Sequence, residues 1–144
     1  MQKKRHWFWN FLIVFTVIVC IFAFTAHYKN WVKVEQDHIK ILSGIYYEKI
    51  DIATIKQVEM VDKIPAMNRI NGFSALTKEK GVFRDSLVDA KVYVYIDDLT
   101  HPKIKLVHHD SLQLFLNFSD SVKTRQLFDY LSLKVEENRS NITQ

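Results

Sequence analysis

A run of 20 residues without a charged side chain, from Trp7 to Ala26, constrains this chain more than any other part of its sequence. Its polar members are Asn10, Thr16 and Thr25. Because a helix rises about 1.5 Å per residue, 20 residues cover about 30 Å, which is the thickness of a bilayer's hydrocarbon core. The sequence therefore predicts a transmembrane helix over residues 7–26 that lies in the membrane lipid bilayer.

A cleaved secretory signal is the alternative interpretation of this run. The apolar part of a signal is usually shorter, about 7 to 15 residues, and ends at an A-x-A-like site. The nearest candidate site, at residues 23–25, has Thr where Ala is preferred. Trp7 and Trp9 lie at one end of the run, and Tyr28 and Trp31 follow the other, as expected for aromatic rings at the two membrane interfaces. The pattern favours an uncleaved anchor.

The basic residues that flank the run predict its orientation. They are Lys3, Lys4 and Arg5 at the N-terminal end, and Lys29, Lys33 and Lys40 at the other. Cytoplasmic flanks carry the denser positive charge. We therefore expect residues 1–6 to be cytoplasmic, with a single pass through the cell membrane and an extracytoplasmic C-terminal domain.

The net charge of +4 is unevenly distributed along the chain. Residues 1–33 carry five basic side chains and no acidic one, a net charge of +5. Residues 34–144 carry the other 15 basic and all 16 acidic side chains, a net charge of −1. Proteins that bind nucleic acid need a concentrated Lys/Arg face. The near-neutral C-terminal part therefore argues against a nucleic-acid partner.

The motifs of common catalytic sites are missing from the sequence, which has no G-x-S-x-G, no H-E-x-x-H and no phosphate-binding loop. Cys20, the single cysteine, lies inside the apolar run, so the chain can form neither an internal disulfide nor a thiolate zinc site. His108 and His109 are adjacent on a predicted strand and should point to opposite faces. We expect no catalytic residue, no cofactor, no metal and no small-molecule substrate.

Alternation of apolar and polar residues predicts short β-strands after a juxtamembrane connector at residues 27–36. The first two strands form a hairpin with its turn at Ser43 and Gly44. Residues 64–86 are less regular and are interpreted as a long loop. The other predicted strands cover residues 55–61, 90–96, 103–108 and 112–118.

A C-terminal helix is predicted after the last strand. Ser119 is a suitable N-cap, and Asp120 a favourable anion for the first turn. An apolar stripe at helical spacing follows, formed by Val122, Leu127, Phe128, Leu131 and Val135. Residues 136–144 are expected to be a flexible tail. The order predicts a mainly β domain at residues 37–135, an antiparallel barrel of about seven strands capped by this helix. Five-stranded OB barrels and lipocalin-like barrels are the competing architectures.

Several segments resemble the bacterial pleckstrin-homology domain families. They are the hairpin at residues 39–50, IDIATIKQVEMVDKIP at 50–65, RINGF at 69–73, KGVFRD at 80–85, AKVYVYID at 90–97 and LFLNFSD at 114–120. The resemblance implies a seven-stranded barrel capped by a helix, often beside transmembrane segments. It does not imply headgroup binding, because the first hairpin loop has only Lys40 and Lys49 at its flanks, with Asp51 close by.

Two groups of residues are candidate contact sites. Arg69 and Asn71, followed by Gly72, either shape the 64–86 loop, with Asn-Gly adopting positive φ, or present Arg69 to a partner. Lys78, Lys80 and Arg84 form the one compact basic set of the domain. This set either is a solvated loop or contacts anionic lipid, where each exposed cation contributes about 1 kcal/mol.

The composition and patterns together predict a membrane-anchored, non-catalytic binding module. We expect its partner to be another membrane protein, recognised through an exposed strand edge or the 64–86 loop. The first alternative is an anionic-lipid sensor that acts through the basic residues at 78–84. The second is an accessory subunit of a membrane enzyme or transporter.

Overall fold

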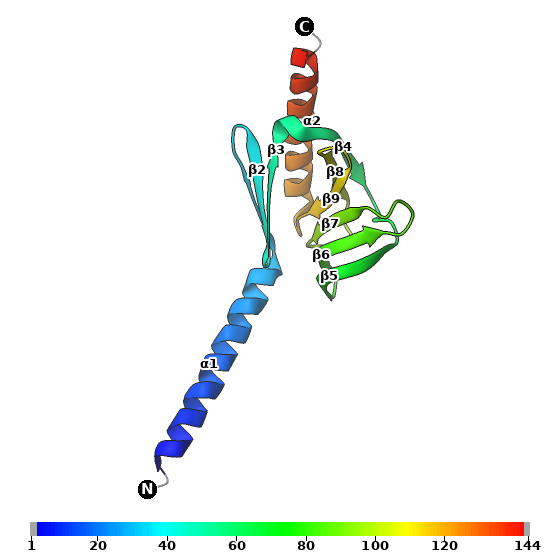
Figure 1. The fold of residues 1–144 in the computed structure, drawn as a ribbon. Coiled ribbons are helices and arrows are strands. Elements are labelled where there is room, and N and C mark those ends of the chain that lie inside the picture. Colours follow the sequence, from blue (N-terminus) through cyan, green and yellow to red (C-terminus); the bar gives the residue numbers. More distant parts are fainter. Residues whose placement is uncertain (1–2, 143–144) are drawn as a thin grey trace.

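The computed structural model describes residues 3–142, which form a mainly β protein with a helix at each end (Figure 1). The helices are α1 (Lys3–Tyr28) and α2 (Ser121–Ile142), and a short 3-10 turn, η1 (Ile52–Thr54), follows the third strand. The strands are β1 (Asn30–Val34), β2 (His38–Ser43), β3 (Tyr46–Asp51), β4 (Ile55–Val61), β5 (Met67–Ala75), β6 (Lys78–Asp85), β7 (Lys91–Ile96), β8 (Lys103–His108) and β9 (Leu112–Asn117).

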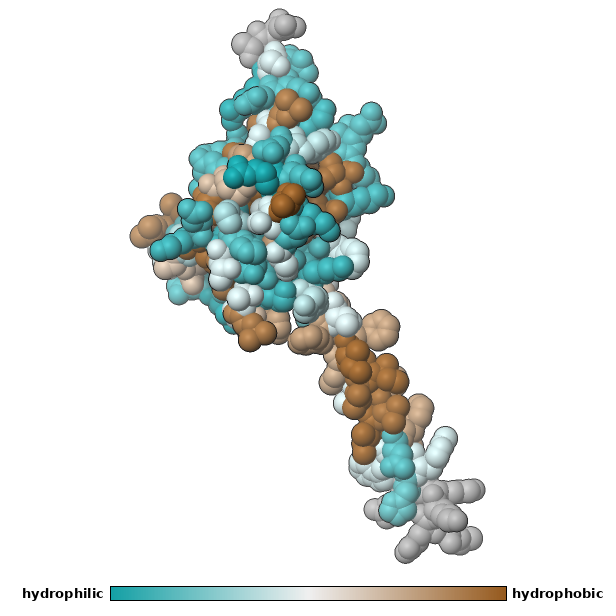
Figure 2. All heavy atoms as spheres, turned by 180° about the vertical axis from the view of Figure 1, so that it is seen from behind, coloured by the Kyte–Doolittle hydropathy of each residue, from teal (hydrophilic) through white to brown (hydrophobic). Residues whose placement is uncertain are grey.

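Helix α1 projects from the rest of the molecule, and its apolar side chains are exposed (Figures 1 and 2). The stretch His6–Tyr28 is long and apolar enough to span a membrane. Lys29 is the one residue between the end of α1 and the start of β1. The sequence predicts a connector at residues 27–36, but the structure has strand β1 there. Hydrogen bonds from Asn30 hold this strand in the domain.

A three-stranded antiparallel sheet follows α1, in the order β1-β2-β3. The predicted hairpin is present, with Ser43 paired to Tyr46 and the turn formed by Gly44 and Ile45. Gly44 has a φ of 64°, a left-handed conformation that glycine adopts without a steric penalty.

The second sheet has six strands in the order β4-β8-β9-β7-β6-β5. Strand β9 lies between β8 and β7, and it runs parallel to β7. The prediction of a closed, wholly antiparallel barrel of about seven strands is therefore wrong. The nine strands of residues 3–142 form two separate sheets, divided between β3 and β4, which are joined by η1 and are not paired. Within the larger sheet, β8 and β9 form a hairpin that inserts β9 beside β7 instead of continuing the meander.

Residues 64–86 hold a hairpin, not a long loop. Strands β5 and β6 pair along their length and meet at a turn formed by Leu76 and Thr77. Gly72 and Gly81 face each other across this pair, and a Cβ on Gly81 would overlap the backbone of β5. Gly81 has a positive φ of 147°, whereas Gly72 does not. The Asn71-Gly72 pair therefore forms no left-handed turn, and Gly72 instead allows the two strands to approach closely.

The main core lies between the three-stranded sheet, the β4-β8-β9 part of the larger sheet and α2. Its fully buried members include Ile39, Ile41, Leu106, Leu114 and Leu131. The predicted C-terminal helix is confirmed, and it packs against β4 and η1. It remains helical as far as Ile142, where the sequence predicts a flexible tail.

Candidate functional site

The end of α1 is held in the domain by buried polar side chains, which we call the polar junction and define as Asn30, Ser43, Lys80, Asp97 and Asn117. All five are at least 95% buried. They come from β1, β2, β6, the end of β7 and the end of β9, so that four segments distant in sequence meet the first residue of β1.

Asn30 is the centre of the polar junction. Its backbone N–H donates to Oδ2 of Asp97 at 2.8 Å, and its Nδ2 donates to the carbonyl oxygens of Tyr95 at 2.6 Å and Asn117 at 2.8 Å. Its Oδ1 accepts from the hydroxyl of Ser43 at 2.5 Å. Every polar atom of the Asn30 side chain thus has a partner, as a buried amide requires.

An ion pair lies beside Asn30. The Nζ atom of Lys80 is 2.8 Å from Oδ1 of Asp97, and both side chains are shielded from solvent. Burial lowers the pKa of Lys80, and the hydrogen bond to Asp97 opposes that effect. Asp97 therefore uses one carboxylate oxygen for the lysine and the other for the backbone of β1.

Asn117 closes the other side of the polar junction. Its Oδ1 accepts from the backbone N–H groups of Asp97 at 2.9 Å and Asp98 at 3.2 Å, and its Nδ2 donates to the carbonyl of Asp98 at 2.6 Å. The same side chain thus fixes the turn after β7 against the end of β9. This position keeps the Asp97 carboxylate directed at Asn30.

The last turn of α1 also contacts the β2–β3 hairpin and the β5–β6 hairpin. The ring of His27 stacks on Phe73 with centroids 5.3 Å apart, and it lies against Gly44, where a Cβ would overlap the ring. The Nζ atom of Lys78 lies 4.6 Å from the centre of the Tyr28 ring. Helix α1 and the domain are consequently joined by packing as well as by the chain.

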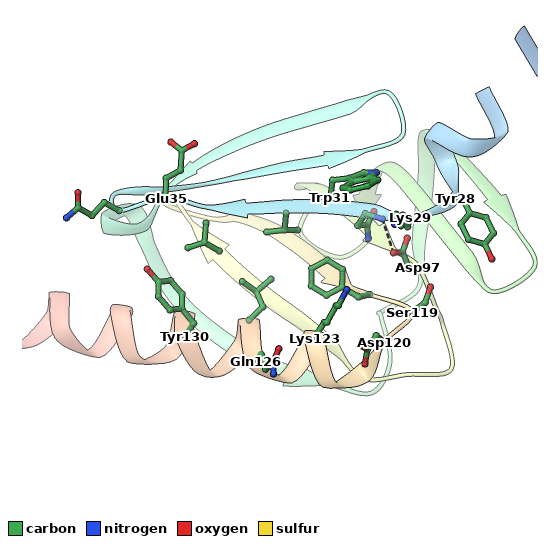
Figure 3. Close-up of a pocket in the computed structure, with 16 residues that line it drawn as sticks. Tyr28, Lys29, Trp31, Glu35, Asp97, Ser119, Asp120, Lys123, Gln126 and Tyr130 are labelled. Atoms are coloured by element: carbon green, nitrogen blue, oxygen red, sulfur yellow. Dashed lines mark hydrogen bonds between the residues drawn. The ribbon is translucent and has the colours of Figure 1, made fainter. Parts of the chain in front are cut away.

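A groove of about 850 Å³ lies between β1 and α2, and we call it the β1–α2 groove. Figure 3 shows Tyr28 and Lys29 at the end next to α1, and Glu35 and Tyr130 toward the other end. Its walls are mainly apolar. The side chains that line it come from Val32, Val34, Phe118, Leu127 and Tyr130, with Ser119, Asp120, Lys123 and Gln126 along the α2 rim.

The edge of β1 that lines the groove has no strand beside it. In an antiparallel pair, alternate residues direct their backbone N–H and C=O groups toward the partner strand and away from it. The hydrogen bond from Glu35 N–H to the His38 carbonyl fixes this alternation, so Val32 and Val34 direct theirs away from β2. Within residues 3–142, no strand is paired to this edge.

Charged groups at the outer end of the groove neutralise one another. Glu35 contacts Lys40 at 2.7 Å and Lys33 at 3.1 Å. The hydrogen bonds from Lys40 and then Lys33 lower the pKa of Glu35 to about 2. On α2, Asp120 accepts from the backbone N–H of Val122 at 2.9 Å, so that it caps the helix in place of the predicted Ser119. The groove is thus apolar in its interior and balanced in charge at its rim.

The candidate residues at 78–84 do not form a basic loop. They lie on β6, where Lys80 is fully buried against Asp97 and the guanidinium of Arg84 contacts Asp89 at 3.0 Å. Lys78 is half-buried beside Tyr28. The compact basic surface that the sequence predicts therefore loses Lys80, whose charge is directed into the domain.

Arg69 and Asn71 lie on the exposed part of β5. The guanidinium of Arg69 lies over the Phe83 ring at 5.7 Å and is 3.7 Å from Glu79. Asn71 accepts a hydrogen bond from the hydroxyl of Tyr46 at 3.3 Å. Both residues thus contact their own sheet or the neighbouring hairpin, and neither lines the β1–α2 groove.

His108 and His109 are placed differently from the prediction. His109 has a φ of 41°, so the two rings meet, with their Nδ1 atoms 3.0 Å apart. Among residues 3–142, no group of three His, Cys, Asp or Glu side chains has the spacing of a metal site.

Sequence patterns gave no signal for the polar junction. Asn30 resembles any polar residue after a membrane helix, and Asp97 resembles a turn residue. These two residues are hydrogen-bonded to each other, although 67 positions separate them along the chain. The available signs of the groove were Leu127 in the predicted apolar stripe of α2, and Val32 and Val34 at alternate positions of β1.

Comparison of the chain with protein-family models, curated proteins and solved structures gave no match.

Proposed function

We propose that this chain is a single-pass, membrane-anchored binding module without catalytic activity, and that its β1–α2 groove binds an extended segment of another membrane protein. The observation that carries the proposal is the unpaired edge of β1 along an apolar groove. An added strand would bond to the outward N–H and C=O groups of Val32 and Val34, while its alternate side chains enter the groove.

The position of the groove supports a partner that is itself in the membrane. The groove begins at Tyr28, in the last turn of α1 (Figure 3). A helix in the bilayer confines the groove to a thin layer of solvent at the membrane surface, which raises the effective concentration of neighbouring membrane proteins. Three expectations from the sequence remain predictions: the cytoplasmic N-terminus, the extracytoplasmic domain and the relationship to bacterial pleckstrin-homology domains.

The two alternative functions have less support. A lipid sensor at residues 78–84 would need Lys80 at the surface, and this side chain is buried. If the chain were an accessory subunit of a membrane enzyme or transporter, it would use the same groove. This alternative differs from our proposal only in the identity of the bound partner.

Photo-crosslinking from the groove tests the proposal in the full-length chain in its native membrane. A benzophenone amino acid replaces Gln126, which is exposed on the groove rim, and in a control it replaces Glu136, which is exposed on α2 outside the groove. We expect Gln126 to crosslink to an extended juxtamembrane segment of another membrane protein, identified by mass spectrometry, and Glu136 not to do so.

A proline variant distinguishes strand addition from simple proximity. Val34→Pro removes an N–H that points into the groove and leaves the bonds between β1 and β2 intact. We expect this variant to remain folded and to lose the Gln126 crosslink. Crosslinks to a second copy of the chain or to lipid alone, or crosslinks unaffected by Val34→Pro, would refute the proposed strand addition.

A further inference from the structure

Two apolar residues project from β-turns at the end of the domain that meets α1. Ile45, in the turn between β2 and β3, is 75% exposed, and Leu76, in the turn between β5 and β6, is 98% exposed. Turns of this kind normally carry Gly, Asn, Asp or Ser, which are suited to water. Leu76 has a φ of 55°, a conformation that is unfavourable for a leucine. Local turn chemistry therefore gives no reason for an apolar side chain at either tip.

Both turns lie beside the last turn of α1. Gly44, next to Ile45, contacts His27. Lys78, two residues after Leu76, lies over Tyr28. Figure 1 shows the β5–β6 turn at the same end of the domain as the top of α1, and Figure 2 shows hydrophobic residues on this end, next to the helix.

The short link fixes how far this end of the domain is from the bilayer. Only Lys29 separates α1 from β1, and the polar junction holds β1 in the domain. If α1 spans the membrane, the turns beside Tyr28 must lie at the level of the lipid headgroups. The neighbouring side chains suit that level, because Tyr28 is exposed and Lys29 lies 4.3 Å from the ring centre of Trp31.

We propose that the domain is seated on the bilayer surface, with Ile45 and Leu76 inserted into the interfacial region of the phospholipids that surround α1. The two inserted tips and the helix make three points of contact, so the domain is held in one orientation relative to the membrane. This inference requires α1 to lie in the bilayer, and it does not depend on a partner for the β1–α2 groove.

Site-directed fluorescence in the full-length protein tests the seating. In a Cys20→Ser background, single cysteines at positions 45, 76, 87 and 14 carry an environment-sensitive nitrobenzoxadiazole label. The protein is reconstituted in phosphatidylcholine vesicles with some phosphatidylglycerol, with and without lipids that carry a nitroxide near the headgroup or deep in the acyl chain. Position 87 is the matched control, because Leu87 is 95% exposed and lies at the opposite end of β6 from Leu76.

We expect the labels at 45 and 76 to have blue-shifted emission and to lose fluorescence to the shallow nitroxide, and the label at 87 to behave as in water. Position 14, in the middle of α1, should be quenched by the deep nitroxide. If 14 is quenched and 76 matches 87, the seating is wrong and the anchor stands. If 14 is not quenched, both the anchor and the seating are wrong.

A second measurement avoids placing a label at the tips themselves. With the label at position 29 and the variant Ile45→Ser/Leu76→Ser, we expect increased rotational freedom of the domain in vesicles, measured by fluorescence anisotropy decay. Leu87→Ser should leave the decay unchanged. Equal decays for the tip variant and the parent protein would contradict the seating.

Discussion

The Nζ atom of Lys80 lies 2.8 Å from Oδ1 of Asp97, and neither side chain is accessible to solvent. The other oxygen of Asp97 accepts from the backbone N–H of Asn30, the first residue of β1. An ion pair in the larger sheet therefore positions the strand that continues from the membrane helix. Because one residue separates β1 from α1, the pair also contributes to fixing the direction of α1 relative to the domain.

Lys80→Met should destabilise the domain by about 3–5 kcal/mol, because it leaves the carboxylate of Asp97 buried without its cation. The measurement is the free energy of unfolding of the full-length protein in detergent, by urea titration. Lys78→Met is the control, since Lys78 is half-buried and its Nζ is 3.3 Å from the Asp97 carbonyl. A loss no larger for Lys80→Met than for Lys78→Met would contradict the role of the ion pair.

Asn30→Ala should destabilise the domain by at least about 1–3 kcal/mol, because it leaves buried groups of Ser43, Tyr95 and Asn117 without partners. Hydrogen exchange should also become faster at the amides of the last turn of α1. Asn68→Ala is the matched control, because its side-chain amide is exposed and donates to the hydroxyl of Ser86 at 3.2 Å. The prediction fails if the two alanine variants unfold at the same urea concentration.

Gly44→Ala should lower the stability of the domain for two separable reasons. A residue with a Cβ pays about 1–2 kcal/mol in the left-handed conformation, and this Cβ would also overlap the ring of His27. Adding His27→Ala should recover the second contribution and not the first. Because His27→Ala also removes the stacking on Phe73, thermal unfolding of both single variants and the double variant is needed to measure the coupling. Additive losses would show that the ring moves aside freely.

The stability of the domain should decrease as the pH falls below about 6.5, the usual pKa of a histidine. Burial, and secondarily His109, lowers the pKa of His108 in the folded protein. The unfolded chain therefore binds the proton first, and the neutral folded form is at its most stable above pH 6.5. Urea midpoints at pH 7.5 and 5.5 measure the decrease. His108→Leu should reduce it, and an unchanged decrease in this variant would assign it to other groups.

Much of the fold follows from local sequence patterns. The hairpin of β2 and β3, strands β4, β7, β8 and β9 and helix α2 were predicted from alternation, turn residues and one apolar stripe. These signals depend on residues within one strand or one helical turn of each other, which a single sequence displays directly.

The errors concern one weak local pattern and two relationships between distant parts of the chain. Strands β5 and β6 were interpreted as a loop because no residue of β5 is buried, so that the two-residue alternation of apolar and polar residues is weak. The parallel pairing of β7 with β9 depends on where a hairpin inserts, and strand patterns do not encode neighbours. Lys80 resembled a surface cation because the carboxylate that compensates its burial is 17 positions away along the chain.

The single residue Lys29 between α1 and β1 has a consequence for how the protein meets its neighbours in the plane of the membrane. A helix advances by about 100° per residue, so one residue inserted into α1 after Ala26 would turn the whole domain by about that angle around the helix axis. The number of residues in the helix thus sets which face of α1 the β1–α2 groove is aligned with. A partner that contacts one face of α1 would therefore reach the β1–α2 groove, or be turned away from it, according to that count.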